Sequence, residues 1–420
     1  MNLLILLIVF LNPSRDSLKL SQCYERVYER YPNAYEKILY QENSELRLKN
    51  LNINYLPQVS LKGQATYQSD VPMIKLNLPN FKIPESSKDR YQLTLDVKQT
   101  IYDGGTTSSL KDIEISQLTA DKQKIEVELF SLKQKVNDLY FSVLLLQEKK
   151  NVTDILINDL KSRIKELESK VENGIVPKSN LYILQAQLLQ SEQEMENTET
   201  DRVASLNMLG ELMDTKIDTK SRLIIPDPKI ENLEFSADYR PEYKLFELQK
   251  QQYDIMKSNV SSRSIPKLSA FGQAGYGRPG LNILDNTFQP YYMVGLNLTW
   301  NPINWNSNNN EIQIYDVNKK IIDKQKETFD KNLHVSLEKY KSDILKFESL
   351  LSKDEEIISL REKIVSSTAS QLQNGSITST TYLTELNNKS QALLTQRTHR
   401  LQLIQSKINF LTTKGIKING

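Results

Sequence analysis

The sequence is poor in the residues that bind metals and form disulfides. It contains one cysteine, Cys23, and two histidines, His334 and His399. One thiol excludes an internal disulfide, and the two histidines lack a metal-ligand spacing, so we expect both on helix surfaces. No Ser-His-Asp constellation, phosphate-binding loop or Cys/His cluster is present. The sequence therefore predicts no enzymatic activity, no cofactor and no metal.

An excess of one charge and a long apolar run are also missing. Lys and Arg number 54, and Asp and Glu number 52, which gives a net charge of +2. Such a balanced charge does not indicate nucleic-acid binding. No internal apolar run reaches the roughly 18 residues that a transmembrane helix needs. We therefore expect no transmembrane helix.

The first residues are apolar, from Leu3 to Leu11. This run is too short to span a bilayer, and it predicts a secretory signal peptide over residues 1–13. No Lys or Arg precedes the run and no clear small-x-small site follows it, so an apolar start of a wrongly assigned reading frame is the alternative. Gln22 stands before Cys23, inside a helical pattern, which argues against a lipid anchor.

The segment Tyr91–Tyr102 alternates between apolar and polar residues. Alternation with period 2 predicts a β-strand with one apolar and one polar face. The strand is long enough to cross a bilayer at a tilt, and aromatic residues stand at both ends. The neighbouring sequence offers only helices with apolar seams of their own, so we expect the apolar face to contact lipid and the polar face water.

This hairpin pattern occurs twice. A strand at 56–67 comes before Tyr91–Tyr102 and forms a hairpin with it. The sequence of 56–67 reappears at 265–276, where the partner strand is Tyr292–Trp300. We therefore predict β-hairpins at 56–102 and 265–301 and an internal duplication, because a period near two hundred residues fits two half-proteins. The repeats are 14–225 and 240–420, joined by a linker at 226–239.

The predicted strand faces define two sets of residues. The first set comprises the apolar side chains expected to face lipid: Leu93, Leu95, Val97, Val294, Leu296 and Leu298. The second set comprises the aromatic residues expected at the strand ends, as a girdle: Tyr67, Tyr91, Tyr276, Tyr292 and Trp300.

The remaining sequence is helical. Residues 17–54 and 240–260 carry helical patterns before the two hairpins. Apolar residues spaced by fours and threes predict long coiled-coil helices after the hairpins, at 107–172 and 311–373. A helix of some 65 residues is about 100 Å long. Glycine turns end each long helix, and helices return at 179–213 and 378–411.

These elements predict a mainly α protein with β: long antiparallel coiled-coil helices plus four amphipathic strands. Four strands cannot close a transmembrane barrel, which has at least eight, and an open edge in lipid leaves backbone groups unpaired. The chain must therefore pool strands with copies of itself, usually by cyclic symmetry. From the residues alone, a dimer and a trimer remain open.

The order, spacing and duplication of several motifs resemble the outer membrane efflux protein family, of the TolC type. The resemblance covers nearly the whole chain. The motifs are the Pro57–Ser60 strand opening and its copy, Ile101–Gly105, the Gly174 and Gly375 turns, Leu206–Gly210 and Arg240-Pro241-Glu242.

The resemblance implies a homotrimer with one twelve-stranded transmembrane β-barrel and a helical tunnel closed at its tip. It further implies a passive exit duct for a tripartite efflux pump or a type I secretion system. Such a duct lies in the outer membrane of a Gram-negative bacterium, with a large periplasmic portion. Its partners would be outer-membrane lipid, a periplasmic adaptor and an inner-membrane RND or ABC transporter, and no nucleic acid.

The same resemblance assigns the tunnel tip, with its gate and adaptor docking, to the two helical turns. The expected residues are Asn173, Gly174, Pro177, Asn180, Asn374, Gly375, Thr378, Thr381 and Glu385. The sequence departs from the family where Asn180 and Thr381 stand, because members often carry Asp six residues after the turn glycine. The acidic ring of some relatives is not evident, and Glu385 is the nearest acid.

Two alternatives lack a barrel. Heptads alone are typical of a rod-like coiled-coil scaffold, and a periplasmic adaptor would carry one coiled-coil hairpin between β-domains. A scaffold does not need four amphipathic strands with aromatic ends, and an adaptor does not need two helical hairpins, so the strands favour the channel.

Overall fold

The computed structural model describes residues 17–71, 87–230, 233 and 239–416. Three predicted parts lie wholly or partly outside the described residues. They are the signal peptide, residues 72–86 between the strands of the first hairpin, and residues 231–232 and 234–238 of the linker. Within the described ranges, no helix combines the length and apolar character needed to cross a membrane.

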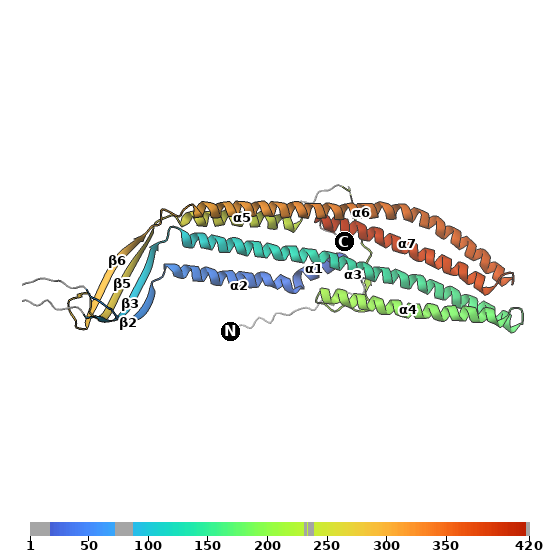
Figure 1. Ribbon diagram of the computed structural model, residues 1–420. Helices are drawn as coiled ribbons and strands as arrows, with labels where there is room; N and C mark the ends of the chain where they lie inside the picture. The colour runs from blue at the N-terminus through green and yellow to red at the C-terminus, as the bar shows by residue number, and fades with distance from the viewer. Residues whose placement is uncertain (1–16, 72–86, 231–232, 234–238, 417–420) are drawn as a thin grey trace, which may run out of the picture. The chain divides into compact units, whose positions relative to one another are not determined.

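The chain is mainly helical, with antiparallel strands (Figure 1). Helices α1 and α2 precede the first hairpin, β2–β3, which leads into the long helix α3 and the returning helix α4. Helix α5 precedes the second hairpin, β5–β6, followed by α6 and α7. The bounds are α1 Leu20–Arg30, α2 Pro32–Asn52, β2 Gln58–Tyr67, β3 Asp89–Tyr102, α3 Thr106–Glu172, α4 Lys178–Leu212, α5 Pro241–Ser262, β5 Lys267–Arg278, β6 Gln289–Thr299, α6 Ser307–Gln373 and α7 Ser379–Lys414.

The chain folds into two compact units, and each takes residues from both halves of the sequence. The strand unit comprises residues 38–122 and 246–325, and the helical unit comprises 1–37, 123–245 and 326–420. The same order of elements occurs twice along the chain, but the compact units do not coincide with the predicted repeats. The duplication itself stays a prediction.

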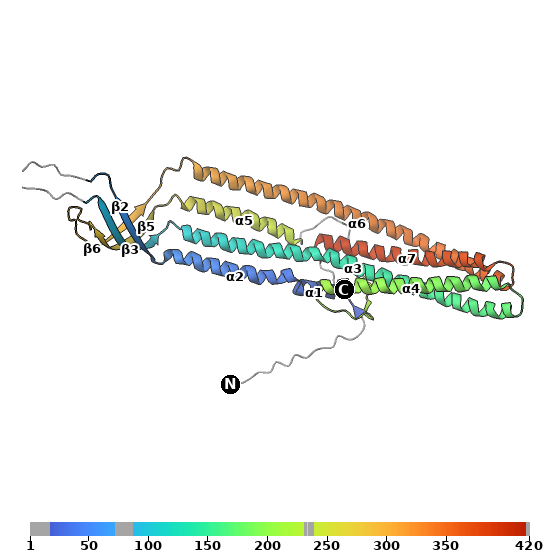
Figure 2. The same ribbon diagram turned by 60° about the horizontal axis from the view of Figure 1, so that its bottom comes forward.

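The strand unit contains a four-stranded antiparallel sheet in the order β2-β3-β5-β6. The two hairpins are joined through the pairing of β3 with β5, so strands from both halves of the chain form one sheet. In Figures 1 and 2, α2 lies beside the start of α3, and α5 beside the start of α6. The two edge strands are β2 and β6.

The helical unit packs the returning helices against the long ones, α4 beside α3 and α7 beside α6 (Figure 2). The heptad seam predicted for α3 is buried along most of its length, as the spacing by fours and threes requires. Buried positions of that seam are Ile125, Leu129, Leu132, Val136, Val143, Ile157, Leu160, Ile164 and Leu167. Near the turns, all four helices contribute to one core, in which Leu160, Leu184, Leu372 and Leu386 are buried.

The Arg240-Pro241-Glu242 motif joins three helices of this unit. Pro241 begins α5, and its carbonyl accepts a hydrogen bond from Gln123 Nε2 on α3 at 2.8 Å. The Arg240 guanidinium binds the Glu242 carboxylate and lies over the rings of Phe130 and Phe329, 4.5 and 5.4 Å from their centroids. This pairing of a cation with two aromatic faces and a carboxylate explains why the motif stands at the start of a helix.

The prediction of one helix over 17–54 is wrong. Tyr31 adopts an extended conformation, with φ −61° and ψ 137°, between α1 and α2. The following Pro32 disfavours helical geometry at Tyr31 and lacks an amide hydrogen to continue the ladder. In addition, Ser17–Leu18 forms strand β1, which pairs in parallel with β4, Arg222–Leu223.

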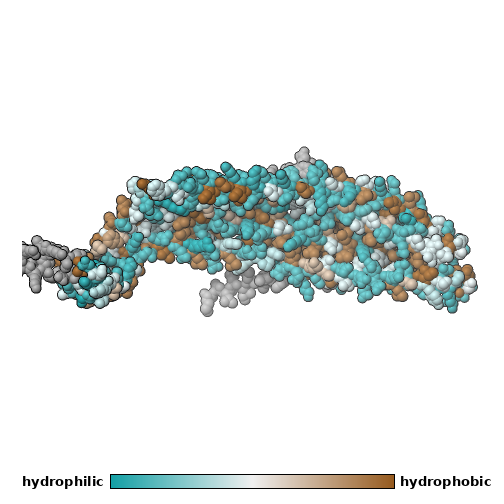
Figure 3. Space-filling model, viewed as in Figure 1, coloured by the Kyte–Doolittle hydropathy of each residue, from teal (hydrophilic) through white to brown (hydrophobic). Residues whose placement is uncertain are grey.

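The second long helix begins at Ser307, earlier than the predicted Glu311. Trp305 and Asn306 have positive φ values of 48° and 66°, and they end the polar turn that follows β6. Asn308, Asn309 and Asn310 precede the predicted start and follow Ser307 in the first turn of the helix. Figure 3 shows the helices covered by a mixture of hydrophilic and hydrophobic residues.

Candidate functional site

The strand register places most apolar side chains of the four strands on one face. Leu95 lies opposite Leu61 on β2 and Ala274 on β5, and Ala270 lies opposite Leu296 on β6. This apolar strand face is exposed: Leu95 is 45% exposed and Leu296 is 68% exposed. Of the six residues expected to face lipid, five are exposed and Val97 is half-buried.

The opposite face is polar, and its residues on the central strand β3 interact with neighbouring strands. Thr94 is only 7% exposed, and the Asp96 carboxylate binds Lys62 Nζ at 3.0 Å and Gln273 Nε2 at 2.6 Å. The arrangement differs from a soluble antiparallel sheet, in which the apolar face is covered. It is the order expected where the apolar face contacts lipid.

Aromatic residues stand at the ends of the strands, as the sequence indicates. The rings of Tyr91 and Tyr276 both contact Phe288, with centroids 6.3 and 5.7 Å apart. At the opposite end of the sheet, Trp300 donates its indole N–H to the Ser264 carbonyl at 3.1 Å. The five girdle residues are all exposed, and their contact with a membrane interface stays a prediction.

Both helical turns have the same backbone conformation. Gly174 and Gly375 have φ values of 69° and 71°, where an L-residue is strained and glycine is not. The amides of Ile175 and Ser376 bond back to Lys170 and Gln371, as in a Schellman cap. The predicted helix ends therefore have a backbone cause, and capping alone accounts for both glycines.

Polar side chains tie the two turns together. Asn180 Oδ1 on α4 accepts the Ser379 backbone N–H, the first residue of α7, at 3.3 Å. Lys170 donates to the Gln373 carbonyl at 2.6 Å and so joins the ends of the two long helices. Thr378 caps α7 by accepting the Thr381 N–H at 3.3 Å. Asn180 thus serves as a cap for the neighbouring helix, a role that explains an amide at this position.

Glu385 forms an ion pair within this chain. Its carboxylate binds Arg361 on α6 at 2.9 Å. The remaining turn residues, Asn173, Gly174, Pro177, Asn374 and Gly375, are exposed. The structure brings all nine predicted tip residues to the two turns or the first turns of the returning helices, and their gating and docking roles stay predictions.

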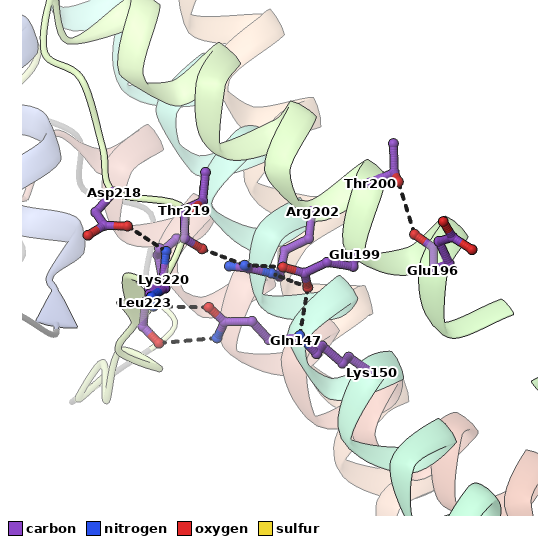
Figure 4. Close-up of polar contacts among 10 residues, drawn as sticks. All are labelled: Gln147, Lys150, Glu196, Glu199, Thr200, Arg202, Asp218, Thr219, Lys220 and Leu223. Atoms are coloured by element: carbon purple, nitrogen blue, oxygen red, sulfur yellow. Dashed lines mark hydrogen bonds and ion pairs between the residues drawn. The ribbon is translucent and has the colours of Figure 1, made fainter. Parts of the chain in front are cut away.

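A polar cluster that the sequence did not predict binds the segment that follows α4 (Figure 4). Arg202 is nearly buried and donates to Glu199 and to the Thr219 carbonyl, the latter at 2.5 Å. Lys150 on α3 also binds Glu199, at 2.8 Å. Gln147 bonds both the amide and the carbonyl of Leu223. These contacts fix β4 and the preceding loop against α3 and α4.

The Glu199 carboxylate is expected to make this cluster sensitive to acid. Hydrogen bonding to Arg202, together with Lys150, lowers the pKa of Glu199 from 4.5 to about 2. A lowered folded-state pKa contributes stability above pH 4.5 that is lost as pH falls toward 2. Glu199→Gln should therefore lower the free energy of unfolding at pH 7 by about 1 kcal/mol, a small value because solvent screens this partly exposed carboxylate. The variant should also lose less stability than the wild type as the pH falls from 4.5 toward 2. Thermal unfolding followed by circular dichroism across pH measures both effects.

Glu196→Gln is the matched control for that experiment. Glu196 lies on the same helix, is exposed, and meets Thr200 only through its backbone carbonyl. Its substitution should leave the acid limb unchanged. Equal behaviour of the two variants would show that the Glu199 contacts do not contribute to stability.

One family model matches part of the chain. Residues 51–214, which contain the first hairpin, α3 and α4, match the model of the family described as "Outer membrane efflux protein". The match supports, for this part of the chain, the resemblance seen in the sequence motifs. No curated protein matches the chain in sequence.

Solved channel structures share the fold along nearly the whole chain. CusC, studied for transmembrane channel formation, aligns with a TM-score of 0.70 and 11% identity over 95% of this chain and 92% of its own. The outer membrane protein VceC of Vibrio cholerae aligns with 0.67 and 12% over 95% and 97%. The open state of the MtrE outer membrane channel of Neisseria gonorrhoeae aligns with 0.62 and 12% over 94% and 89%. These identities show a shared fold.

Proposed function

We propose that the chain is one protomer of an outer-membrane channel-tunnel, which acts as the passive exit duct of a tripartite efflux pump or a type I secretion system. The observation that carries the proposal is the four-stranded sheet with an exposed apolar face and a polar face on the opposite side. The family of residues 51–214 and the channel fold of the chain support it.

The barrel requires several copies of the chain. In lipid, the open edges of β2 and β6 would leave backbone groups unpaired, each at a cost of several kcal/mol. Pairing the edges with those of neighbouring copies removes this cost and closes the barrel by cyclic symmetry. Three copies supply the twelve strands that the family resemblance implies.

The two helical turns are the proposed docking end of the duct. They are exposed, short and lined by small polar residues such as Ser376 and Thr380, which allows close approach of another helical hairpin. We propose that a periplasmic adaptor binds here and links the duct to an inner-membrane RND or ABC transporter. The tunnel then crosses the periplasm of a Gram-negative cell, and its barrel lies in the outer membrane.

A coiled-coil scaffold or an adaptor protein fits the strand unit less well. Either would be soluble, and the exposed leucines and valines of one whole sheet face would then meet water. An apolar surface of that kind marks a contact with lipid or another protein. The sheet therefore favours the channel.

Assembly tests the proposal directly. The protein, extracted in a mild detergent and treated with an amine-reactive crosslinker, should give bands of one, two and three subunits and no larger species. Light scattering should give the mass of three chains after correction for detergent. A monodisperse monomer that stays soluble without detergent would contradict both the barrel and the trimer.

A further inference from the structure

The polar face of the sheet carries an excess of positive charge. The strand register places four basic side chains on this face and a single carboxylate, that of Asp96. The basic residues are Lys62, Arg90, Lys98 and Lys267. Asp89 and Arg278 lie on the other face and form an ion pair with each other at 2.7 Å.

The one carboxylate of the polar face is already neutralised. Asp96 binds Lys62 Nζ at 3.0 Å and accepts hydrogen bonds from Gln273 and Thr94 at 2.6 and 3.4 Å. Within the part of the chain that the structure describes, Arg90, Lys98 and Lys267 form no ion pair. Their charges are therefore available to a solute on this face.

Two of these cations share a hollow of about 580 Å³ where the strands meet the long helix α3. Lys98 and Lys267 line it together with the hydroxyls of Thr100, Ser269 and Thr299. Ammonium and hydroxyl donors are the groups that bind anions. The hollow also contains Asp103, but its oxygens accept the amides of Gly105 and Thr107 and the Tyr55 hydroxyl at 3.0, 2.7 and 3.1 Å.

Aromatic rings lie beside the cations. Phe271 stands directly opposite Lys98 in the register, and its ring covers Gly295, where an added Cβ would be 2.8 Å from the ring. Tyr291 covers Gly275 in the same way. Apolar rings lower the local dielectric and so strengthen the attraction between an anion and a nearby ammonium group.

From these observations we infer that the polar face of the sheet is an anion-attracting surface and that the pore passes anions in preference to cations. The inference rests on the proposed function, because it needs this face to line a pore. It narrows the cargo to solutes with a carboxylate, sulfate or phosphate group, and it assigns Lys98 and Lys267 as the residues that set the preference.

The reversal potential in planar bilayers tests the inference. With a tenfold KCl gradient across the wild-type channel, the sign of the reversal potential should show that chloride passes in preference to potassium. The double substitution Lys98→Gln/Lys267→Gln should lower the chloride-to-potassium permeability ratio by up to about tenfold, since charges in a confined polar space concentrate counterions by at least this factor. Both lysines lie on the strand surface and are not buried, so glutamine fits at each position.

Asp96→Asn should change the chloride-to-potassium permeability ratio in the opposite direction. It removes the only carboxylate of the polar face and frees Lys62, so the permeability ratio should rise. Lys49→Gln removes an exposed lysine of α2, away from the strands; it is the control and should leave the ratio unchanged. Cation preference in the wild type, or a ratio that neither strand substitution shifts, overturns the inference. A wild-type protein that forms no channel overturns the proposed function itself.

Discussion

Arginine at Leu296 is expected to destabilise the assembled barrel by about 2–4 kcal/mol, the cost of a cation at mid-height on a lipid-facing strand. Leu296 lies in the middle of β6 and is 68% exposed on the apolar strand face. Arginine at Leu95, in the middle of β3, should have the same effect. Urea unfolding in lipid vesicles, followed by tryptophan fluorescence, measures the change.

Asn297→Arg is the matched control, because it places the same side chain one residue further on the same strand. Asn297 lies on the polar face, opposite Ser269. The variant should assemble with wild-type stability and change the single-channel conductance, since its guanidinium would face the proposed pore. Equal destabilisation by Leu296→Arg and Asn297→Arg would show that the assignment of the two faces is wrong.

The strand faces could be predicted from the sequence because a period of 2 fixes which side chains share a face. The pairing of β3 with β5 could not, because this pairing joins segments from opposite halves of the chain. Alternation alone does not define a register between such segments. The Asp96 partner Gln273 follows from that register and was missed for the same reason.

The helix ends were predictable wherever glycine marked them. Gly174 and Gly375 stand where the backbone needs a positive φ, and both long helices end there. Pro32 was also visible and should have marked the break in the first helical segment, since a residue before proline avoids helical geometry. The two-residue strands β1 and β4 have no periodic pattern, so no sequence signal announces them.

The polar contacts of the helical unit could not be predicted, because their residues have the spacing of ordinary exposed helix residues. Glu199 and Arg202 are spaced like any exposed ion pair on a helix, and only the fold shows that Arg202 is nearly buried and bonds the Thr219 carbonyl. Asn180 likewise gave no sign that it caps α7. Side chains that bond another element depend on tertiary placement, which local spacing does not contain.

Locking the helical turns is expected to abolish export. If the proposed duct opens by movement of α4 and α7 against α3 and α6 at the turns, a crosslink there between neighbouring protomers of the proposed trimer should hold the tip closed. Cysteines at Asn180 and Thr381, oxidised to a disulfide, provide the lock. The locked protein should keep its trimeric mass while its single-channel conductance and its transport fall to background, and reduction should restore both.

The native Cys23 can remain in place during this experiment. Its side chain is fully buried, and burial raises the pKa of the Cys23 thiol to about 12. Because the thiolate is the reactive form, Cys23 takes no part in disulfide exchange at neutral pH. The single variants Asn180→Cys and Thr381→Cys serve as controls, and neither should respond to oxidation in transport or conductance.

The mobility of the crosslinked species decides where the lock has formed. Asn180 lies within hydrogen-bonding distance of Ser379 in its own protomer, so a disulfide inside one chain would leave a monomer band on a non-reducing denaturing gel. A crosslink between protomers gives bands of two and three subunits. If those larger bands account for all the protein and transport continues undiminished, the gate does not lie at the turns, and the returning helices do not need to move there for export.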